Sequence, residues 1–181
     1  MHGIVLKQLK EFVIENYDRE TWELLQHESG VGGKVYVPVT EYPDEDVLAL
    51  LETAVELTGL EQSELLRAFG TFLVAPLVET YGVHVNGDWN GLELIANVET
   101  YIHEALRAKQ LSTYTPPALE SAWIDDERVL VVYDSDRKLC HLAQGIIEGV
   151  GEHFGEPLET TEESCMHDGA TQCTFVVSSA N

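Results

Sequence analysis

Apolar residues recur at intervals of three and four through most of the first hundred positions, which predicts a helical N-terminal part. The pattern covers residues 3–16, 44–58 and a stretch that begins at about residue 61. Pro76 lies inside that last stretch and predicts a kink or a restart of the helix. A further helix is expected over residues 92–109, where the apolar arc is wide enough to be buried on most of its circumference.

Short polar residues and glycines mark the expected ends of these helices. Asp18 is a suitable N-cap for a helix that carries Trp22, and we expect Asp44 and Asp88 to cap the helices that follow them. Gly59 is expected to end the helix that begins at Asp44.

The second half of the chain changes to the alternation that is typical of strands. Residues 119–124 and 128–133 predict two strands joined in a hairpin at 125–127. Residues 138–154 return to helical spacing. The tail predicts two more strands, at 158–164 and 171–177, with a turn at 168–170. We therefore expect one α+β domain over 1–181, with a helical N-terminal lobe of about 1–65 and a lobe of about 66–181 that contains the antiparallel sheet and its flanking helices.

One imidazole, His103, lies inside the apolar arc of the helix expected at 92–109. Leu92, Ile95 and Ile102 lie on the same stripe, so His103 should face the interior of the protein. A lone buried histidine is commonly a core residue whose ring nitrogens are hydrogen-bonded. It can also be a metal ligand, for example the proximal ligand of haem iron.

A second polar pattern, Tyr133-x-Ser135-x-Arg137, follows the strand expected at 128–133. If the chain stays extended, the three side chains point to the same side. Two hydroxyls and a planar guanidinium suit a pair of carboxylates. Taken alone, the pattern is equally typical of a polar strand end with an exposed arginine.

Together these motifs resemble the haem nitric oxide/oxygen binding (H-NOX) family, whose fold is shared with the sensor domain of soluble guanylate cyclase. Three motifs carry the resemblance, and other segments agree with it in order and spacing. The motifs are His103, Thr115-Pro116-Pro117 and Tyr133-x-Ser135-x-Arg137; the other segments are residues 1–5, 68–70 and 165–173.

The resemblance implies a haem b between the two lobes, with His103 as the iron ligand. It also implies that Tyr133, Ser135 and Arg137 bind the haem propionates and that Pro117 presses on the porphyrin and bends it. Family positions that line the distal side match Val5, Leu9, Leu73 and Leu142.

Oxygen-binding relatives carry a distal tyrosine at the place of Leu142. An apolar distal pocket offers no donor to bound O₂, so the resemblance implies binding of nitric oxide and CO without a stable O₂ complex. In the family, nitric oxide releases the proximal histidine from the iron, the haem flattens and the lobes shift. The output would occur on a separate partner such as a histidine kinase or a cyclic dinucleotide enzyme. We find no catalytic motif and expect no enzyme activity.

Three cysteines, Cys140, Cys165 and Cys173, lie in the last third of the chain. Related proteins with this tail bind zinc through three such cysteines and a histidine, and here Glu162 stands at the histidine position. Glu162, His167, His141 or water could complete a tetrahedral zinc site, whereas the alternative is three free thiols. A non-haem, zinc-containing small-molecule or redox-sensing regulatory domain, of the kind found in four-vinyl-reductase-like proteins, is the competing function.

The chain is strongly acidic, with 32 acidic and 10 basic residues and a formal net charge of −22. This charge argues against nucleic acid and anionic membranes as partners. It is typical either of a cytoplasm with high salt, where charge repulsion is screened, or simply of an acidic surface. Four histidines at termini, in loops or at helix ends are expected to be solvated: His2, His27, His84 and His153. No apolar run of 18 residues and no signal peptide are present, so we expect a soluble cytoplasmic protein.

Overall fold

The computed structural model describes residues 1–104, 107 and 116–180. The expected continuation of the His103 helix through 105–106 and 108–109 lies outside the described residues, as does Thr115 of the Thr-Pro-Pro motif. The α-helices are α1 (Gly3–Asn16), α2 (Arg19–Glu28), α3 (Asp44–Thr58), α4 (Gln62–Tyr81), α5 (Gly91–Val98) and α7 (Cys140–Phe154). Short 3₁₀ turns span Gly82–His84 and Met166–Asp168, and a π turn spans Glu99–His103.

The four strands form one antiparallel sheet in the order β1-β2-β4-β3. They are β1 (Ala118–Asp125), β2 (Arg128–Asp134), β3 (Leu158–Ser164) and β4 (Cys173–Ser179). Buried residues alternate along β2 and β4, so that one face of the sheet packs on the helices. The α+β architecture with an antiparallel sheet is therefore confirmed.

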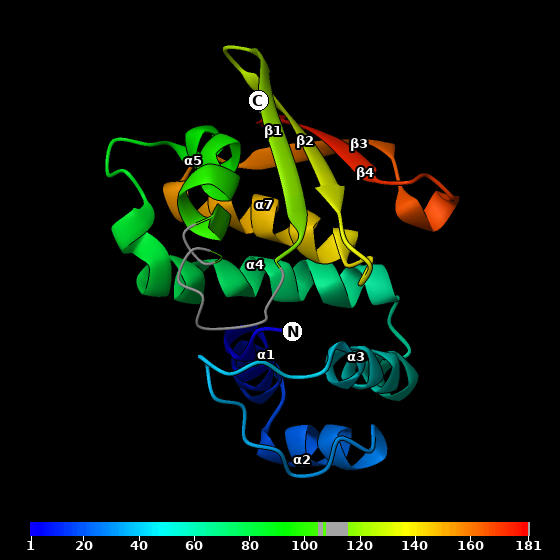
Figure 1. Cartoon of the computed structure of the whole chain (residues 1–181). Coiled ribbons are helices and arrows are strands. Elements are labelled where there is room, and N and C mark those ends of the chain that lie inside the picture. Colours follow the sequence, from blue (N-terminus) through cyan, green and yellow to red (C-terminus); the bar gives the residue numbers. More distant parts are fainter. Residues whose placement is uncertain (105–106, 108–115, 181) are drawn as a thin grey trace.

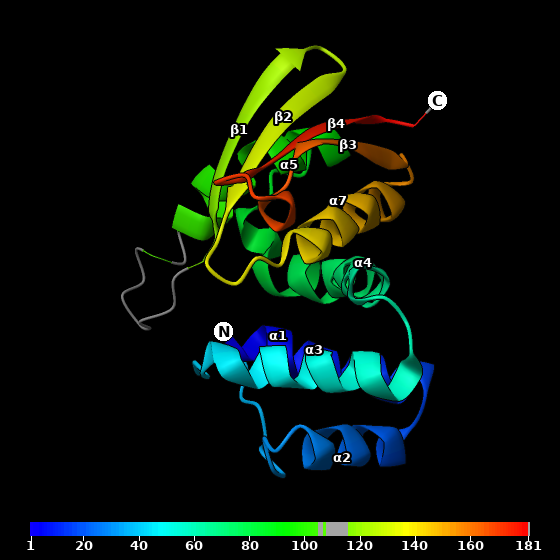
Figure 2. The same cartoon turned by 90° about the vertical axis from the view of Figure 1, so that its right-hand side faces the viewer.

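The elements are stacked in layers, which Figures 1 and 2 show from two sides. The sheet covers α7, α4 lies beneath α7, and α1 and α3 lie side by side beneath α4. Helix α2 forms the outermost layer. Two groups of buried residues follow this arrangement. One joins the sheet to α5, α7 and α4, and the other joins α1, α2 and α3.

Helices α4 and α7 approach each other closely because glycines stand at their crossing. A Cβ atom on Gly145 would lie 2.2 Å from the carbonyl oxygen of Arg67, and one on Gly70 would lie 2.5 Å from that of Leu142. Real Cβ atoms do not approach backbone this closely, so these positions have no room for a side chain. The crossing holds the helical layers against the sheet layer.

Several helix ends agree with the sequence and two do not. Asp18 accepts a hydrogen bond from the amide of Thr21 at 2.7 Å and caps α2, and Gly59 ends α3 in the left-handed conformation with φ 68°. The expectation that Asp44 and Asp88 are N-caps is wrong. Asp44 is the first residue of α3, and its carboxylate accepts from the N-terminal amine of Met1 at 2.6 Å instead.

Helix α5 is capped by Asn90, two residues beyond Asp88. The side chain of Asn90 accepts from the amide of Glu93 at 2.9 Å, and the carboxylate of Glu93 accepts from the amide of Asn90 at 2.8 Å. This reciprocal pair satisfies two backbone donors at once, which a lone aspartate further upstream does not achieve.

Among the described residues, no helix combines the length and the apolar character that a membrane span requires.

Pro76 lies within α4, which continues through it as one helix of 20 residues.

Candidate haem-binding site

A cavity of about 240 Å³ lies between the sheet and the helices beneath it. It is lined by residues of α1, α4, α5, the π turn, β1, β2 and α7. Eight of the site residues expected from the sequence line it: Val5, Leu73, His103, Pro117, Tyr133, Ser135, Arg137 and Leu142. The structure therefore brings together groups that lie as much as 137 positions apart in the sequence.

Leu9 is the one expected distal residue that does not line this cavity. It lines a second cavity of about 80 Å³ in the helical layers. Val5 and Leu142 line both cavities, so they form part of the partition between them. Leu9, one turn after Val5 on α1, thus faces the helical layers and not the larger cavity.

His103 is held by a carboxylate on its own helical segment. Its Nδ1 lies 2.9 Å from Oε2 of Glu99, and Oε1 of Glu99 lies 2.6 Å from Nη2 of Arg107. A carboxylate accepts, so Nδ1 carries the proton and Nε2 keeps its lone pair. Burial lowers the pKa of His103, and the hydrogen bond to Glu99 opposes this effect without cancelling it. The imidazole is thus kept neutral, as a metal ligand must be.

The helical segment around His103 is not the regular α-helix that the apolar spacing predicts. Helix α5 ends at Val98, and Glu99–His103 forms a π turn. Turns of this kind are rare and occur frequently at functional sites. Periodicity alone cannot distinguish them from an α-helix, because one turn shifts the pattern by a single residue.

Tyr133, Ser135 and Arg137 line one region of the cavity, but the chain is not extended through all three. Strand β2 ends at Asp134, and the chain turns at 136–137 before α7 begins at Cys140. Lys138 has φ 51° in this turn, and its amide donates to the carbonyl of Ser135 at 2.9 Å. The three side chains therefore meet through a turn, which the simple alternation rule did not anticipate.

Tyr133 is buried, and burial raises the pKa of its phenol, although the hydrogen bond to Ser135 and the nearby charge of Arg137 oppose the shift. The side chain of Arg137 is 13% exposed, and its Nε lies 3.4 Å from Oδ1 of Asp44. The same oxygen accepts from the amine of Met1. The cluster links the sheet layer to the first residues of α3 and to the N-terminus.

The rest of the lining is mainly apolar, with two further polar residues. Tyr81 at the end of α4 lines the cavity, and burial raises the pKa of its phenol. His2 also lines it and is half-buried, with its pKa lowered by burial. The expectation that His2 is a solvated terminal residue is therefore wrong, because α1 and the strand-like contact of His2 with Glu41 fold the terminus inward.

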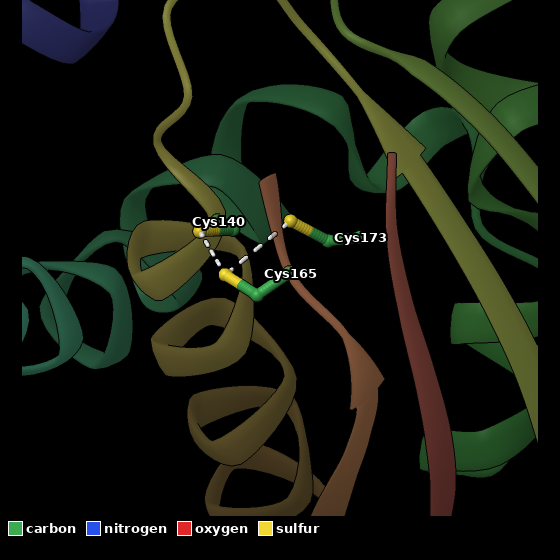
Figure 3. Close-up of side chains that lie close together, drawn as sticks. All are labelled: Cys140, Cys165 and Cys173. Carbon is green, nitrogen blue, oxygen red and sulfur yellow. Dashed lines mark hydrogen bonds between the residues drawn. The ribbon is translucent and has the colours of Figure 1, made fainter. Parts of the chain in front are cut away.

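The three cysteines meet in the interior, as Figure 3 shows. The Sγ atoms of Cys140 and Cys173 each lie 3.8 Å from that of Cys165, and all three residues are buried. The amide of Met166 donates to the sulfur of Cys173 at 3.2 Å. Burial and the neighbouring thiols raise the pKa of Cys140, so that without a bound cation the group is a neutral thiol.

Side chains on two different sides reach the thiol cluster. Ligand atoms of His167 and His141 lie within 4.8 Å of Cys140, and those of Glu162 and Asp168 lie within 4.8 Å of Cys165. Glu162 accepts from the amide of the buried Gln144 at 3.0 Å. His141 and His167 stack with ring centroids 5.5 Å apart. The three expected cysteines thus form one cluster, with His141 and His167 near Cys140 and Glu162 near Cys165.

Sequence reasoning missed the partners of the site residues. Glu99 and Arg107 were not among the expected site residues, although the spacing of four residues between Glu99 and His103 was a usable signal for a hydrogen-bonded pair. Asp44 gave no such signal, because its approach to Arg137 depends on how the lobes pack.

The set of donors fits haem. An apolar slot accepts the macrocycle, a neutral imidazole on one wall can hold iron, and a phenol, a hydroxyl and a guanidinium at one region can hold two propionates. No other group of the described residues combines these features with a cavity of this size.

Comparisons with solved structures give the same fold. An H-NOX protein from S. oneidensis in the Fe(II)NO ligation state matches with a TM-score of 0.92, 22% identity and 100% of each chain covered. The H-NOX domain from Shewanella oneidensis in the Fe(II)CO ligation state matches with a TM-score of 0.87, 22% identity and coverage of 100% of this chain and 99% of the other. An Fe(II) unliganded H-NOX protein from K. algicida has a TM-score of 0.85 and 20% identity, over 100% of this chain and 97% of that one.

A comparison with curated proteins finds no significant match. The model of the family described as Haem-NO-binding matches residues 2–162, which is most of the chain. The match includes His103, Pro117 and the Tyr-x-Ser-x-Arg residues, which the structure gathers around one cavity. The chain therefore belongs to the Haem-NO-binding (H-NOX) family.

Proposed function

We propose that this protein is a haem-based gas sensor that binds nitric oxide and CO through a haem b held by His103. The observation that carries the proposal is the shared cavity, in which a neutral imidazole and the group Tyr133, Ser135 and Arg137 line the same apolar slot. Relatives of the same fold have Fe(II)NO and Fe(II)CO ligation states. Haem, when bound, supplies the ferrous iron that takes up the gas.

Each residue then has a distinct task. His103 offers Nε2 to the iron, since Glu99 holds its Nδ1–H. Arg137 offers a planar pair of donors to one propionate, and Tyr133 and Ser135 add hydroxyls beside it. Pro117 also lines the cavity, and its rigid ring is suited to press on the macrocycle.

Selectivity for gases is inferred from the residues at the expected distal positions of the cavity. Val5, Leu73 and Leu142 offer no hydrogen bond to a bound diatomic ligand. Bound O₂ carries partial negative charge and gains from such a donor, whereas nitric oxide and CO need it much less. We therefore propose that the protein forms no stable O₂ complex.

The signal would arise from release of His103. His103 would hold the iron from the π turn and Pro117 would rest against the macrocycle, so that loss of the His103 contact on gas binding would free the turn. Arg137 pairs with Asp44 of the helical layers, so a change at the propionate side reaches α3 and the N-terminus. This is a ligand event that biases a two-state arrangement of packed lobes.

The output would occur on a separate protein, for which a histidine kinase or a cyclic dinucleotide enzyme is the expected class. The role of this chain would be binding and not catalysis. We propose a cytoplasmic location, in agreement with three cysteines that form no disulfide.

We also propose a structural zinc at Cys140, Cys165 and Cys173. Thiolates that bind zinc at about 2.3 Å in a tetrahedron are separated by about 3.8 Å, and the two separations from Cys165 are both 3.8 Å. The amide of Met166 that donates to Cys173 is the kind of outer partner that stabilises a zinc thiolate. Glu162 and His167 are the two candidates for the fourth ligand.

The first experiment is the visible absorption spectrum of the reduced protein, purified with haem supplied, before and after anaerobic addition of nitric oxide. The expected result is a five-coordinate ferrous band that shifts on addition of nitric oxide, with no stable oxygenated spectrum in air. Protein that retains no haem under these conditions would contradict the sensor function, and a stable oxygenated spectrum would contradict the selectivity.

Metal analysis of the same preparation tests the zinc site. We expect one zinc per chain in the parent protein and its loss in Cys165→Ser. Glu162→Gln and His167→Gln separate the two fourth ligands, because only the variant that lacks the true ligand should lose zinc to a mild chelator. Parent protein without zinc would contradict the site.

A further inference from the structure

Glu99 and Arg107 form a charged chain behind His103 that the sensor function does not itself require. The carboxylate of Glu99 uses one oxygen for Nδ1 of His103 and the other for the guanidinium of Arg107. The side chains of Glu99 and His103 are about one-fifth exposed, at 21% and 17%, while Arg107 is 37% exposed. The inner pair is therefore shielded and the outer cation faces solvent.

A carboxylate that accepts from the outer nitrogen of a metal-bound imidazole makes that imidazole a stronger donor, because negative charge is shared into the ring. The size of this effect depends on how much charge the carboxylate keeps. A guanidinium on its second oxygen withdraws part of that charge. Glu99 thus makes His103 a stronger ligand, and Arg107 limits this effect by drawing charge from Glu99.

We propose that Glu99 strengthens the bond between His103 and the haem iron and that Arg107 limits this effect, so that the pair sets how readily the gas releases His103. The inference rests on the proposed haem site and deepens it by naming what tunes the switch. Glu99 and Arg107 are positioning residues, since they act on the iron only through His103.

The π turn gives this arrangement a structural basis. Glu99 and His103 are the first and last residues of the turn, and residues four apart on a helical segment lie on the same face, so their side chains meet. A release of His103 from iron would leave its hydrogen bond to Glu99 intact. The histidine would then move together with its carboxylate.

The test is the iron–histidine stretching band in the resonance Raman spectrum of the ferrous, gas-free holoprotein, read together with the reduction potential. Glu99→Gln keeps the side-chain shape and removes the charge, so we expect the band to move to lower frequency and the potential to rise. Arg107→Gln leaves Glu99 with more charge, so the band should move to higher frequency and the potential should fall. Glu104→Gln, at an exposed neighbouring carboxylate, is the control and should change neither.

On addition of nitric oxide, the ratio of released to bound His103 should rise by about tenfold in Glu99→Gln and fall in Arg107→Gln. Loss of a hydrogen-bonding partner of a metal ligand typically changes metal affinity by about this factor or more. Arg107→Lys keeps the charge and should stay near the parent. If Glu99→Gln binds no haem, the expected rise of the iron–histidine stretching frequency in Arg107→Gln still tests the inference.

Opposite shifts distinguish tuning from a merely structural role, which would move both variants in the same direction. Unchanged bands in both, or shifts of the same sign, would overturn the inference while leaving the haem site intact. Failure of the parent protein to bind haem would instead overturn the proposed function.

Discussion

The two walls of the cavity that carry its chemistry are built in different ways. His103 lies on the π turn, and none of the five residues of that turn, all of which the structure describes, is buried. Tyr133 lies on β2 opposite Cys173 of β4 and is itself buried. Cys140 begins α7, in which Gly145 and Gly149 lie against the backbone of α4.

The difference indicates which wall can move. A short turn in which no residue is fully buried changes its position at smaller cost. The end of β2 pairs with β4 at Cys173, and Cys140 begins α7, so both adjoin the buried thiol cluster and cannot shift without opening the core. The proposed iron ligand is on the wall that can move, and the residues proposed to bind the propionates are on the stiff wall, which cannot. A sensor that works by release of His103 requires this division, because the propionates must stay anchored while the histidine leaves.

Removal of His103 should have the largest effect on this arrangement. In His103→Gly the imidazole is lost while the stiff wall is untouched, so we expect loss of the five-coordinate ferrous spectrum and of tight haem binding. Free imidazole in the buffer should restore the spectrum, because the deleted side chain leaves room for it. The absorption spectrum with and without imidazole measures both effects.

A variant that fails to recover with imidazole, yet has a parent-like thermal unfolding curve, would show that His103 is not the iron ligand. Recovery of the spectrum without recovery of the response on a partner would show that the connection to the π turn carries the signal.

Gly145→Ala should be the next largest change, and it acts on the stiff wall. The added Cβ would lie 2.2 Å from the carbonyl oxygen of Arg67, so α4 and α7 must separate. We expect a loss of about 3 kcal/mol in the free energy of unfolding, at the upper end of the usual cost of overpacking. Denaturant unfolding measures it.

Gly82→Ala is the matched control, because its nearest atom, on Val78, lies 4.0 Å from the added Cβ and its backbone is helical. It should unfold within about 0.5 kcal/mol of the parent. Equal losses in the two variants would show that the α4–α7 crossing is not a stiff element.

The sequence was sufficient for most of the fold, because its patterns are local. Helical spacing located α1 and α7 to within two residues, and alternation located β3 at its observed bounds. The caps at Asp44 and Asp88 were wrong because a cap depends on the backbone of the residue itself. Asn90 competes for the same role two positions later and makes the reciprocal pair with Glu93.

The site was predictable where a motif carries its own chemistry and not where packing creates the neighbour. The resemblance implied that His103 and the Tyr-x-Ser-x-Arg residues share one site, and they do line one cavity. The approach of Asp44 to Arg137 crosses from one set of layers to the other, and no local pattern encodes it. The position of Leu9 in the second cavity also depends on how α1 is rotated against α4.

Arg137→Gln should have an intermediate effect and shows how the stiff wall holds haem. The variant loses a charge-assisted pair with a carboxylate, for which about 2 kcal/mol is a typical value, or about a 30-fold weaker affinity for haem. Transfer of haem to an acceptor protein measures this affinity. The Soret band of the haem that remains should keep its position, since His103 is unchanged.

Asp44→Asn is the comparison that separates the two partners of Arg137. It removes the charge that faces Arg137 in the helical layers but leaves the guanidinium for a propionate, so haem affinity should change by no more than a few-fold. Loss equal to that of Arg137→Gln would show that Arg137 acts by holding the lobes together.

The smallest effect is a difference in how pH weakens the two walls of the haem-free protein. Burial lowers the pKa of His103, so below its ordinary value of about 6.5 the unfolded chain binds a proton that the folded chain does not. The free energy of unfolding therefore falls as pH drops from 7 towards 5. Burial raises the pKa of Tyr133, so above about pH 10 the unfolded chain loses a proton that the folded chain keeps, and stability falls as pH rises.

His103 should thus lower the free energy of unfolding at acid pH and Tyr133 at alkaline pH. His2, His141 and other tyrosines also titrate in these ranges, so single variants are needed to isolate the contribution of each residue. His103→Gln should reduce the slope of stability with pH only between 5 and 7, and Tyr133→Phe only above about pH 9. Denaturant unfolding at several pH values measures both slopes. A change in the acid slope of Tyr133→Phe would mean that the two walls are coupled and do not respond to protons separately.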